Sequence, residues 1–144
     1  MNISRLSSLS SAVALALLLA SCASGPKVEG TWKDVGATGN GNITAAIDHS
    51  SIKKNGNFAT FRDKKTVLKT NEERYVNTPK YKTAVGEWEI NCRNKTYRLT
   101  ALKLLDESGK ILMDEKYTAT KLRPMQIIEG SITEKQFKAV CTGN

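Results

Sequence analysis

The sequence contains few of the residues that build enzymes and metal sites. Among its 144 residues there are one histidine, three cysteines and three prolines. Acidic residues number 14, compared with 22 lysines and arginines. With a single histidine and no C-x-x-C spacing, a zinc site is short of ligands and a redox motif lacks its usual form. No glycine-rich phosphate-binding pattern is present. We therefore expect no metal, no cofactor and no enzymatic activity.

The single histidine, His49, stands between Asp48 and Ser50, which together supply the residue types of a catalytic triad. Triad members must converge from positions that align a nucleophile, a base and an orienting acid. Three consecutive residues that alternate across the end of a strand do not converge easily. We therefore expect His49 to be a solvated or capping residue.

Long hydrophobic runs are also absent, and the main one, residues 12–20, is too short to cross a membrane. A spanning helix needs about 20 apolar residues. The run follows Arg5 and leads to Cys22, so this pattern predicts a secretory signal. Residues 19–21, Leu-Ala-Ser, resemble the bacterial lipobox, in which cleavage exposes the cysteine and its sulfur carries a diacylglycerol.

Lipidation of Cys22 predicts a signal peptide at residues 1–21 and a mature chain that starts at this cysteine. The alternative is an ordinary signal peptide cleaved after Ala23 or Ser24, which would discard Cys22. Several acyl chains together anchor a protein stably, whereas one chain binds only marginally. Ala23 stands where an aspartate would signal retention in the inner membrane, so we expect sorting to the outer membrane.

The mature chain divides into a tether and one folded domain. Residues 22–41 are rich in Ala, Ser and Gly, and the glycine-rich stretch DVGATGNGN occupies residues 34–42, so we expect a lipidated tether and a flexible N-terminal segment. Residues 42–144 suffice for one domain with a single core. Removing residues 1–21 leaves a net charge of about +7.

Alternating apolar and polar residues predict antiparallel strands over most of this domain. We expect strands at residues 43–48, 50–54, 57–63, 66–70, 85–92, 96–105 and 111–118. Asn55-Gly56 predicts a hairpin turn. Within residues 96–105 the apolar residues shift from odd-numbered to even-numbered positions, and this shift predicts a bulge. Ser131 and Glu134 form a capping box before a short amphipathic helix at residues 132–141. The fold class is therefore α+β, a single antiparallel sheet of about six strands with a C-terminal helix.

With Cys22 acylated, Cys92 and Cys141 are the two remaining thiols in a compartment that oxidises thiols. The strand pattern places Cys92 on the buried face with Trp88 and Ile90, and Cys141 lies on the apolar side of the predicted helix. A disulfide would fix the helix to the sheet, and closing a loop of about 50 residues is worth roughly 4 kcal/mol. The alternative, a redox or metal pair, lacks the spacing and the ligands.

Three segments together resemble one protein family in their order and spacing. They are IDHSSIKKNGNFATF at residues 47–61, WEINCRNKTYRLTAL at 88–102 and FKAVC at 137–141. They are similar to the surface-adhesin protein E-like family of Gram-negative bacteria, over residues 42–141. The resemblance implies about six antiparallel strands with a C-terminal helix held by a disulfide. It also implies dimerisation and, for the founding members, binding of host vitronectin, laminin and plasminogen.

Basic residues of the predicted strands and turns form a candidate basic binding face. They are Lys53, Lys54, Arg62, Lys64, Lys65, Lys69, Arg93, Lys95 and Arg98. Brought together, these cations would attract an acidic partner. Such partners are sulfated glycosaminoglycans, acidic segments of matrix proteins and the phosphates of outer-membrane lipid, whereas export excludes cytosolic nucleic acid. The alternative is a solvated basic surface that keeps the protein soluble or lies against an anionic membrane.

The sequence therefore predicts an outer-membrane lipoprotein at the cell surface that binds host extracellular-matrix or plasma proteins. A periplasm-facing lipoprotein with a structural or accessory role in the envelope is the alternative. An inhibitor of host lysozyme is a third hypothesis, against which the positive charge argues, because lysozyme is itself cationic and like charges slow encounter.

Overall fold

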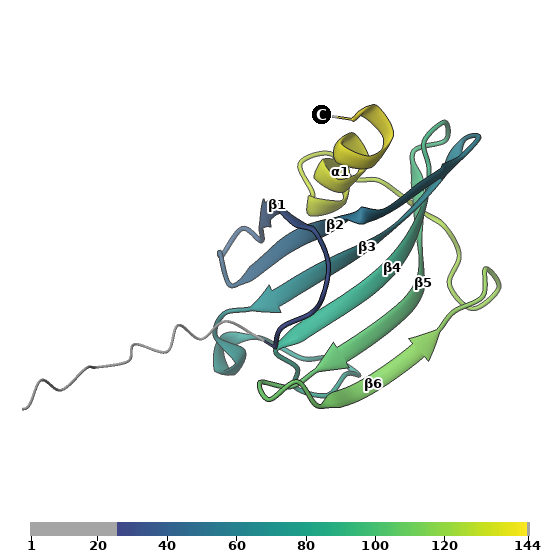
Figure 1. Cartoon of the computed structure of the whole chain (residues 1–144). Coiled ribbons are helices and arrows are strands. Elements are labelled where there is room, and N and C mark those ends of the chain that lie inside the picture. The colour runs from purple at the N-terminus through teal and green to yellow at the C-terminus, as the bar shows by residue number, and fades with distance from the viewer. Residues whose placement is uncertain (1–25, 144) are drawn as a thin grey trace, which may run out of the picture.

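The computed structural model describes residues 26–143, which form one curved antiparallel sheet with a short helix against one face (Figure 1). The strands are β1 (Trp32–Ala37), β2 (Ile43–Asn55), β3 (Phe58–Val67), β4 (Thr83–Asn91), β5 (Thr96–Leu105), β6 (Ile111–Lys116) and β7 (Met125–Gln126). β1 to β6 lie side by side in chain order, and β7 pairs with β5. A 3₁₀ turn, Thr70–Glu72, precedes β4, and the helix α1 (Ile132–Phe137) continues into a π-helical turn, Lys138–Thr142. The predicted α+β fold is confirmed.

Two predictions fall on the part of the chain before residue 26. The signal peptide at residues 1–21 and the lipidated Cys22 lie outside the described residues. Within residues 26–143, no helix is long and apolar enough to cross a bilayer.

The sheet begins at Trp32, so the prediction of a flexible segment up to residue 41 was wrong for β1. This strand pairs with β2 from Trp32 opposite Asp48 to Ala37 opposite Thr44. Gly36 has a φ of 126° and lies at a bulge in the strand. In the sequence Gly36 indicated a loose loop, but in the structure it accommodates a bulge in an edge strand.

The segments predicted as separate strands at residues 43–48 and 50–54 form one strand, β2. Its register with β3 shifts between Asp48 and Lys53, and this irregularity breaks the period-two pattern in the sequence. β3 continues to Val67, so residues 66–70 form no strand of their own. The hairpin turn consists of Gly56 and Asn57, and Gly56 has a φ of 59°, which suits the first central position of a II′ turn.

The bulge predicted from the change of parity in β5 is confirmed. Trp88 pairs with Leu99 and Glu87 pairs with Ala101, so Thr100 is the extra residue on β5. Before the bulge the odd-numbered residues of β5 lie on the face that the helix covers, and after it the even-numbered residues do. Tyr97 and Leu99 thus share a face with Leu102, although their spacing in the sequence changes.

The core lies between α1 and the sheet face that it covers, which we call the helix face. Ile47, Phe61 and Ile90 reach it from three neighbouring strands, and Val140 reaches it from the π-helical turn. Ile47 and Ile90 are fully buried and Val140 is 1% exposed. Burial of such a side chain contributes about 1.5–3 kcal/mol, so these few residues hold the helix on the sheet.

A polar cluster is buried next to this core. The carboxylate of Asp63, 1% exposed, accepts hydrogen bonds from Gln136 Nε2 at 2.8 Å and from Lys65 Nζ at 2.6 Å. It also accepts one from the backbone N–H of Gly86 at 3.2 Å, where an added Cβ would lie 2.7 Å from Asp63 Oδ1. A buried carboxylate requires such partners. The Gln136 contact therefore fixes the helix over the middle of β3.

The helix begins at the predicted cap. Ser131 Oγ accepts the backbone N–H of Glu134 at 3.1 Å, which satisfies one of the free donors of the first turn. The Glu134 carboxylate accepts the N–H of Gly130 instead of that of Ser131. The capping box is thus present, with one partner displaced by one residue.

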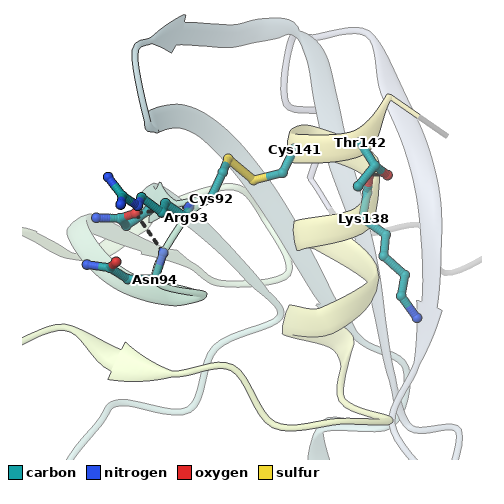
Figure 2. The surroundings of a disulfide bond; sticks show 7 residues. Cys92, Arg93, Asn94, Lys138, Cys141 and Thr142 are labelled. Atoms are coloured by element: carbon teal, nitrogen blue, oxygen red, sulfur yellow. Dashed lines mark hydrogen bonds between the residues drawn. A yellow bond between two sulfur atoms is a disulfide. The ribbon is translucent and has the colours of Figure 1, made fainter.

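The predicted disulfide is confirmed. Cys92 follows the last residue of β4 and is bonded to Cys141 in the π-helical turn, with 5.7 Å between the two Cα atoms (Figure 2). The bond joins the end of the central strand to the end of the chain. It therefore restrains the helix at the end opposite its N-cap.

Removing this bond is expected to weaken the domain without changing its fold. We expect a Cys92→Ser/Cys141→Ser variant to lose about 4 kcal/mol of unfolding free energy, because the unfolded chain regains the entropy of a loop of about 50 residues. Urea unfolding with and without dithiothreitol measures this loss. The reductant should destabilise the native protein and leave the double variant unchanged. Two alkylatable thiols in the unreduced native protein would contradict the bond.

Candidate functional site

The nine cations of the candidate basic face do not lie together. Side chains alternate across a strand, so Arg62 and Lys64 lie on the face opposite the helix, which we call the outer face, whereas Lys65 lies on the helix face. Lys69 follows β3 at one end of the sheet, and Lys53 lies near the other end, opposite Thr60. The period of the strands therefore divides the predicted face.

Two cations of the outer face have acidic partners. Arg62 forms an ion pair with the buried Asp48, with 2.6 Å between Nη2 and Oδ2. Arg98 lies on β5 opposite Glu89, and their charged groups are 3.3 Å apart. Because these charges are compensated within the protein, they add little to an external positive field.

Two more of the nine cations are also paired. Lys65 donates to Asp63 in the buried cluster and lies 5.0 Å from the centroid of the Trp88 ring. Lys69 is 3.1 Å from Glu72. Lys65 is thus part of the structural core, and the charge of Lys69 is balanced at the surface.

Of the five remaining cations, Lys64 lies over the Trp32 ring on the outer face. The other four lie together at one end of the sheet, which we call the cationic end: Lys53, Lys54, Arg93 and Lys95. All four are exposed, and none takes part in an ion pair among residues 26–143. The first two end β2, and the other two lie in the β4–β5 turn. Phe58 pairs with both Asn55 and Asn91, so the two turns are neighbours, as the upper right of Figure 1 shows.

The β4–β5 turn holds its cations in a defined backbone. Asn91 Oδ1 accepts the N–H of Arg93 at 3.1 Å and that of Asn94 at 3.0 Å. Lys95 has a φ of 53°, and the adjacent Cys92 is bonded to the helix (Figure 2). The backbone N–H of Cys92 also donates to the carbonyl of residue 57 in the neighbouring turn at 2.8 Å. The two turns are therefore fixed relative to each other.

An aromatic residue at this end was not predicted as a site residue. Phe58 is 46% exposed and lies at the start of β3, between the two turns that carry the cations. It shares the outer face with Thr60 and Arg62, and the alternation of apolar and polar residues along β3 predicts a polar residue at this position. That mismatch is the signal in the sequence that could have identified it. The cationic end thus combines four positive charges with an exposed apolar ring.

The N-terminal strap, residues 26–31, crosses the outer face before β1 (Figure 1). Trp32 Nε1 donates to the carbonyl of Val28 at 2.7 Å, and Arg62 donates to the carbonyl of Glu29. The indole of Trp32 lies under two cations, with Lys64 Nζ 4.6 Å and Arg62 Cζ 5.1 Å from the ring centroid. Burial lowers the pKa of Lys64. The strap therefore covers the middle of a face that the helix leaves open.

Asp48 holds the end of this strap. Its carboxylate accepts the backbone N–H of Thr31 at 2.9 Å, the hydroxyl of Ser50 at 2.6 Å and the guanidinium of Arg62 at 2.6 Å. Burial raises the pKa of Asp48, but the hydrogen bonds from Ser50, Arg62 and Thr31 outweigh it and lower the pKa from 3.8 to about 2. Asp48 is therefore charged whenever the strap is docked at neutral pH.

The residue types around His49 do not form a triad. Asp48 and Ser50 are joined directly, and no hydrogen bond links the His49 ring to either of them in the described part of the chain. No three His, Cys, Asp or Glu side chains of residues 26–143 are grouped so that they could hold a metal ion.

The low pKa of Asp48 predicts how stability depends on pH. Because the pKa is lower in the folded than in the unfolded state, its contribution is complete above the unfolded value of about 3.9 and is lost as pH falls through about 2. An Asp48→Asn variant should therefore melt below the parent at neutral pH, and the difference should shrink toward pH 2. Thermal unfolding followed by circular dichroism measures it. Asp114→Asn, at an exposed ion pair, should show little difference, and a gap for Asp48→Asn that stays constant with pH would contradict the assignment.

The fold is similar to solved structures of one bacterial protein. A crystal form II structure of Haemophilus influenzae protein E has a TM-score of 0.55 and 15% identity, and the match covers 83% of this chain and 94% of that chain. Protein E from non-typeable Haemophilus influenzae has a TM-score of 0.51 and 14% identity, with 83% and 81% covered. At these identities the likeness is one of fold. No curated protein matches the chain.

The family comparison covers the whole sheet and the helix. The model of the family described as surface-adhesin protein E matches residues 32–142, from the first residue of β1 to the end of the π-helical turn. The match starts before residue 42, where the sequence motifs had placed the resemblance, and it includes both cysteines of the disulfide. The family is one of surface adhesins and not of enzymes. The chain therefore belongs to the surface-adhesin protein E family.

Proposed function

We propose that this protein is a lipid-anchored outer-membrane adhesin that binds host matrix or plasma proteins, or their sulfated glycosaminoglycans, through the cationic end. Membership of the surface-adhesin protein E family supports the adhesin role. The signal at residues 1–21 and the lipobox cysteine, Cys22, support the anchor.

One observation carries the choice of surface. None of the seven ion pairs in residues 26–143 involves a cation of the cationic end. The four cations are thus exposed to solvent and outside any ion pair of this range, although the charge of Lys95 interacts with that of Glu134 on the neighbouring helix. Sulfate groups and acidic protein segments are the partners that such a cluster attracts. Phe58 adds exposed apolar area, which the four charged side chains alone do not provide.

Neutralising the cationic end is expected to weaken binding of heparin and of vitronectin. We expect a Lys53→Gln/Lys54→Gln/Arg93→Gln/Lys95→Gln variant of the mature chain, carrying Cys22→Ser, to bind at least about tenfold more weakly. Four exposed ion pairs at about 0.5 kcal/mol each amount to about 2 kcal/mol. Surface plasmon resonance at two salt concentrations measures both ligands, and the affinity should fall as salt rises.

The matched control removes the same charge from other surfaces. Lys33→Gln/Lys80→Gln/Lys110→Gln/Lys116→Gln also replaces four exposed lysines, none of them in the two turns. This control should retain most of the affinity. Equal losses in the two variants would show that net charge alone governs binding, and salt-independent binding would count against an electrostatic surface.

The position of the domain in the envelope separates this proposal from a role inside the periplasm. Protease treatment of intact cells should degrade the domain if it is exposed at the cell surface. An intracellular and a periplasmic marker protein that stay intact serve as controls. A domain that is fully protected until the outer membrane is opened would favour the periplasm-facing accessory role.

A further inference from the structure

The two ends of the sheet differ in what they expose. The cationic end has been described, and the opposite end, which we call the anchor end, is formed by the β1–β2 turn, the β3–β4 connection at residues 68–82 and the β5–β6 turn at residues 106–110. The register places Thr44, Thr66, Thr83 and Leu105 in one row along this end. β4 has nine residues and runs from this row to the cationic end, a length of about 30 Å.

The N-terminal strap starts at the anchor end. Pro26 lies against the β5–β6 turn, where a Cβ added to Gly109 would be 3.2 Å from Pro26 Cβ. From there the strap lines a groove of about 580 Å³ on the outer face, with Val28 and Glu29 on one side and Val85 and Lys103 on the other. Its far end is held by Asp48 through the N–H of Thr31. Docking of the strap therefore sets where the preceding chain leaves the domain.

The chain before the strap is short. Cys22 and Pro26 are four residues apart in the sequence, and four residues span at most about 14 Å even when fully extended. If Cys22 carries the lipid, the β5–β6 turn cannot lie farther than this from the membrane surface. The anchor end is therefore held next to the bilayer by the length of the tether alone.

Three large apolar side chains are exposed at this same end. Leu68 is 49% exposed just after β3, Val76 is 60% exposed in the β3–β4 connection, and Ile111 is 52% exposed at the start of β6. They come from three different segments. Exposed apolar groups of this size are a feature of surfaces that contact a membrane or another protein.

The charges at the anchor end are balanced, unlike those at the cationic end. The three segments of the anchor end carry five cations and four acids, and Lys69 is paired with Glu72. Lys80 donates to Asn71 in the same connection. Glu107 accepts the hydroxyl of Thr70 across to the β5–β6 turn. This end therefore offers apolar contact without a strong field of either sign.

We propose that the anchor end lies on the lipid surface that holds the acyl chains of Cys22, with Leu68, Val76 and Ile111 at the headgroups, so that the cationic end points away from the membrane. This inference rests on the lipid anchor of the proposed function. It names a second interaction surface, whose partner is the membrane interface and not a protein. It also explains how a tether of few residues presents the cationic end about 30 Å above the bilayer.

Fluorescence quenching in vesicles tests this orientation. The full lipidated chain is reconstituted into phosphatidylcholine vesicles containing headgroup-spin-labelled lipid, as a Val76→Trp variant and as an Asn94→Trp variant, with the parent as background for its own tryptophans. We expect the added fluorescence at position 76 to be strongly quenched and that at position 94 to be unaffected. Equal quenching at both positions, or stronger quenching at position 94, would overturn the proposed orientation.

A pair of matched variants tests the apolar contact itself. In the Val76→Trp protein, Leu68→Ser/Ile111→Ser should reduce the quenching, whereas Phe58→Ser/Ile128→Ser, at exposed apolar residues elsewhere, should leave it unchanged. Unchanged quenching in both would refute the contact of these side chains with lipid. The mass of the N-terminal peptide is measured on the same samples, and an unmodified Cys22 would overturn the anchor and this inference together. Heparin binding in solution is independent of both results, so the failure of the orientation and the failure of the adhesin role are distinguishable.

Discussion

The joint between the C-terminal helix and the sheet is the constraint on which the rest of the structure depends. α1 has only six residues, and a helix of this length is not stable by itself. It stays in place because Val140 enters the core, Gln136 reaches the buried Asp63 and Cys141 is bonded to Cys92. Without this cover, Ile47, Phe61 and Ile90 would face water on the helix face.

The same joint positions the candidate binding surface. Cys92 lies between the last residue of β4 and the turn that carries two of the four cations. Its backbone N–H also contacts the β2–β3 turn, which follows the other two. Turns at the tips of long hairpins are commonly mobile. Here a covalent bond and a hydrogen bond hold both tips, so the charges are presented in a fixed arrangement, which reduces the entropy lost on binding.

The outer face of the sheet is covered by extended chain and not by a helix. A sheet buries one face against a helix and leaves the other to water, unless more chain covers it. Here the N-terminal strap covers the outer face. Val85 is therefore only 9% exposed, although its side chain lies on the outer face and not under the helix. Four consecutive residues of β4 are therefore buried, because chain covers both faces of the strand at this point. The helix and the strap thus complete the fold from opposite sides, and the strap also determines where the preceding chain leaves the domain.

Much of the fold and part of the site could be predicted from the sequence. Local periodicity was sufficient for the strands around Trp88 and Leu99, for the bulge in β5 and for the cap at Ser131, because each depends on neighbouring residues. The disulfide followed from the expectation that Cys22 carries a lipid, since the two other cysteines then allow one pairing. The cationic character of the chain likewise needs no structure.

Only the tertiary structure decided which cations act together. Lys64 and Lys65 are adjacent in the sequence and lie on opposite faces, whereas Lys53 and Arg93 are far apart in the sequence and lie on neighbouring turns. Pairing with Asp48 and Asp63 removes further cations from the field, and these acids become partners only across strands. The strand at Trp32 was also missed, because an edge strand with a bulge has no regular pattern of its own and forms by pairing with β2. The sequence by itself determined the elements and the chemistry of their side chains, and the packing of strands distant in the chain determined the surface, because charge and burial depend on neighbours in space.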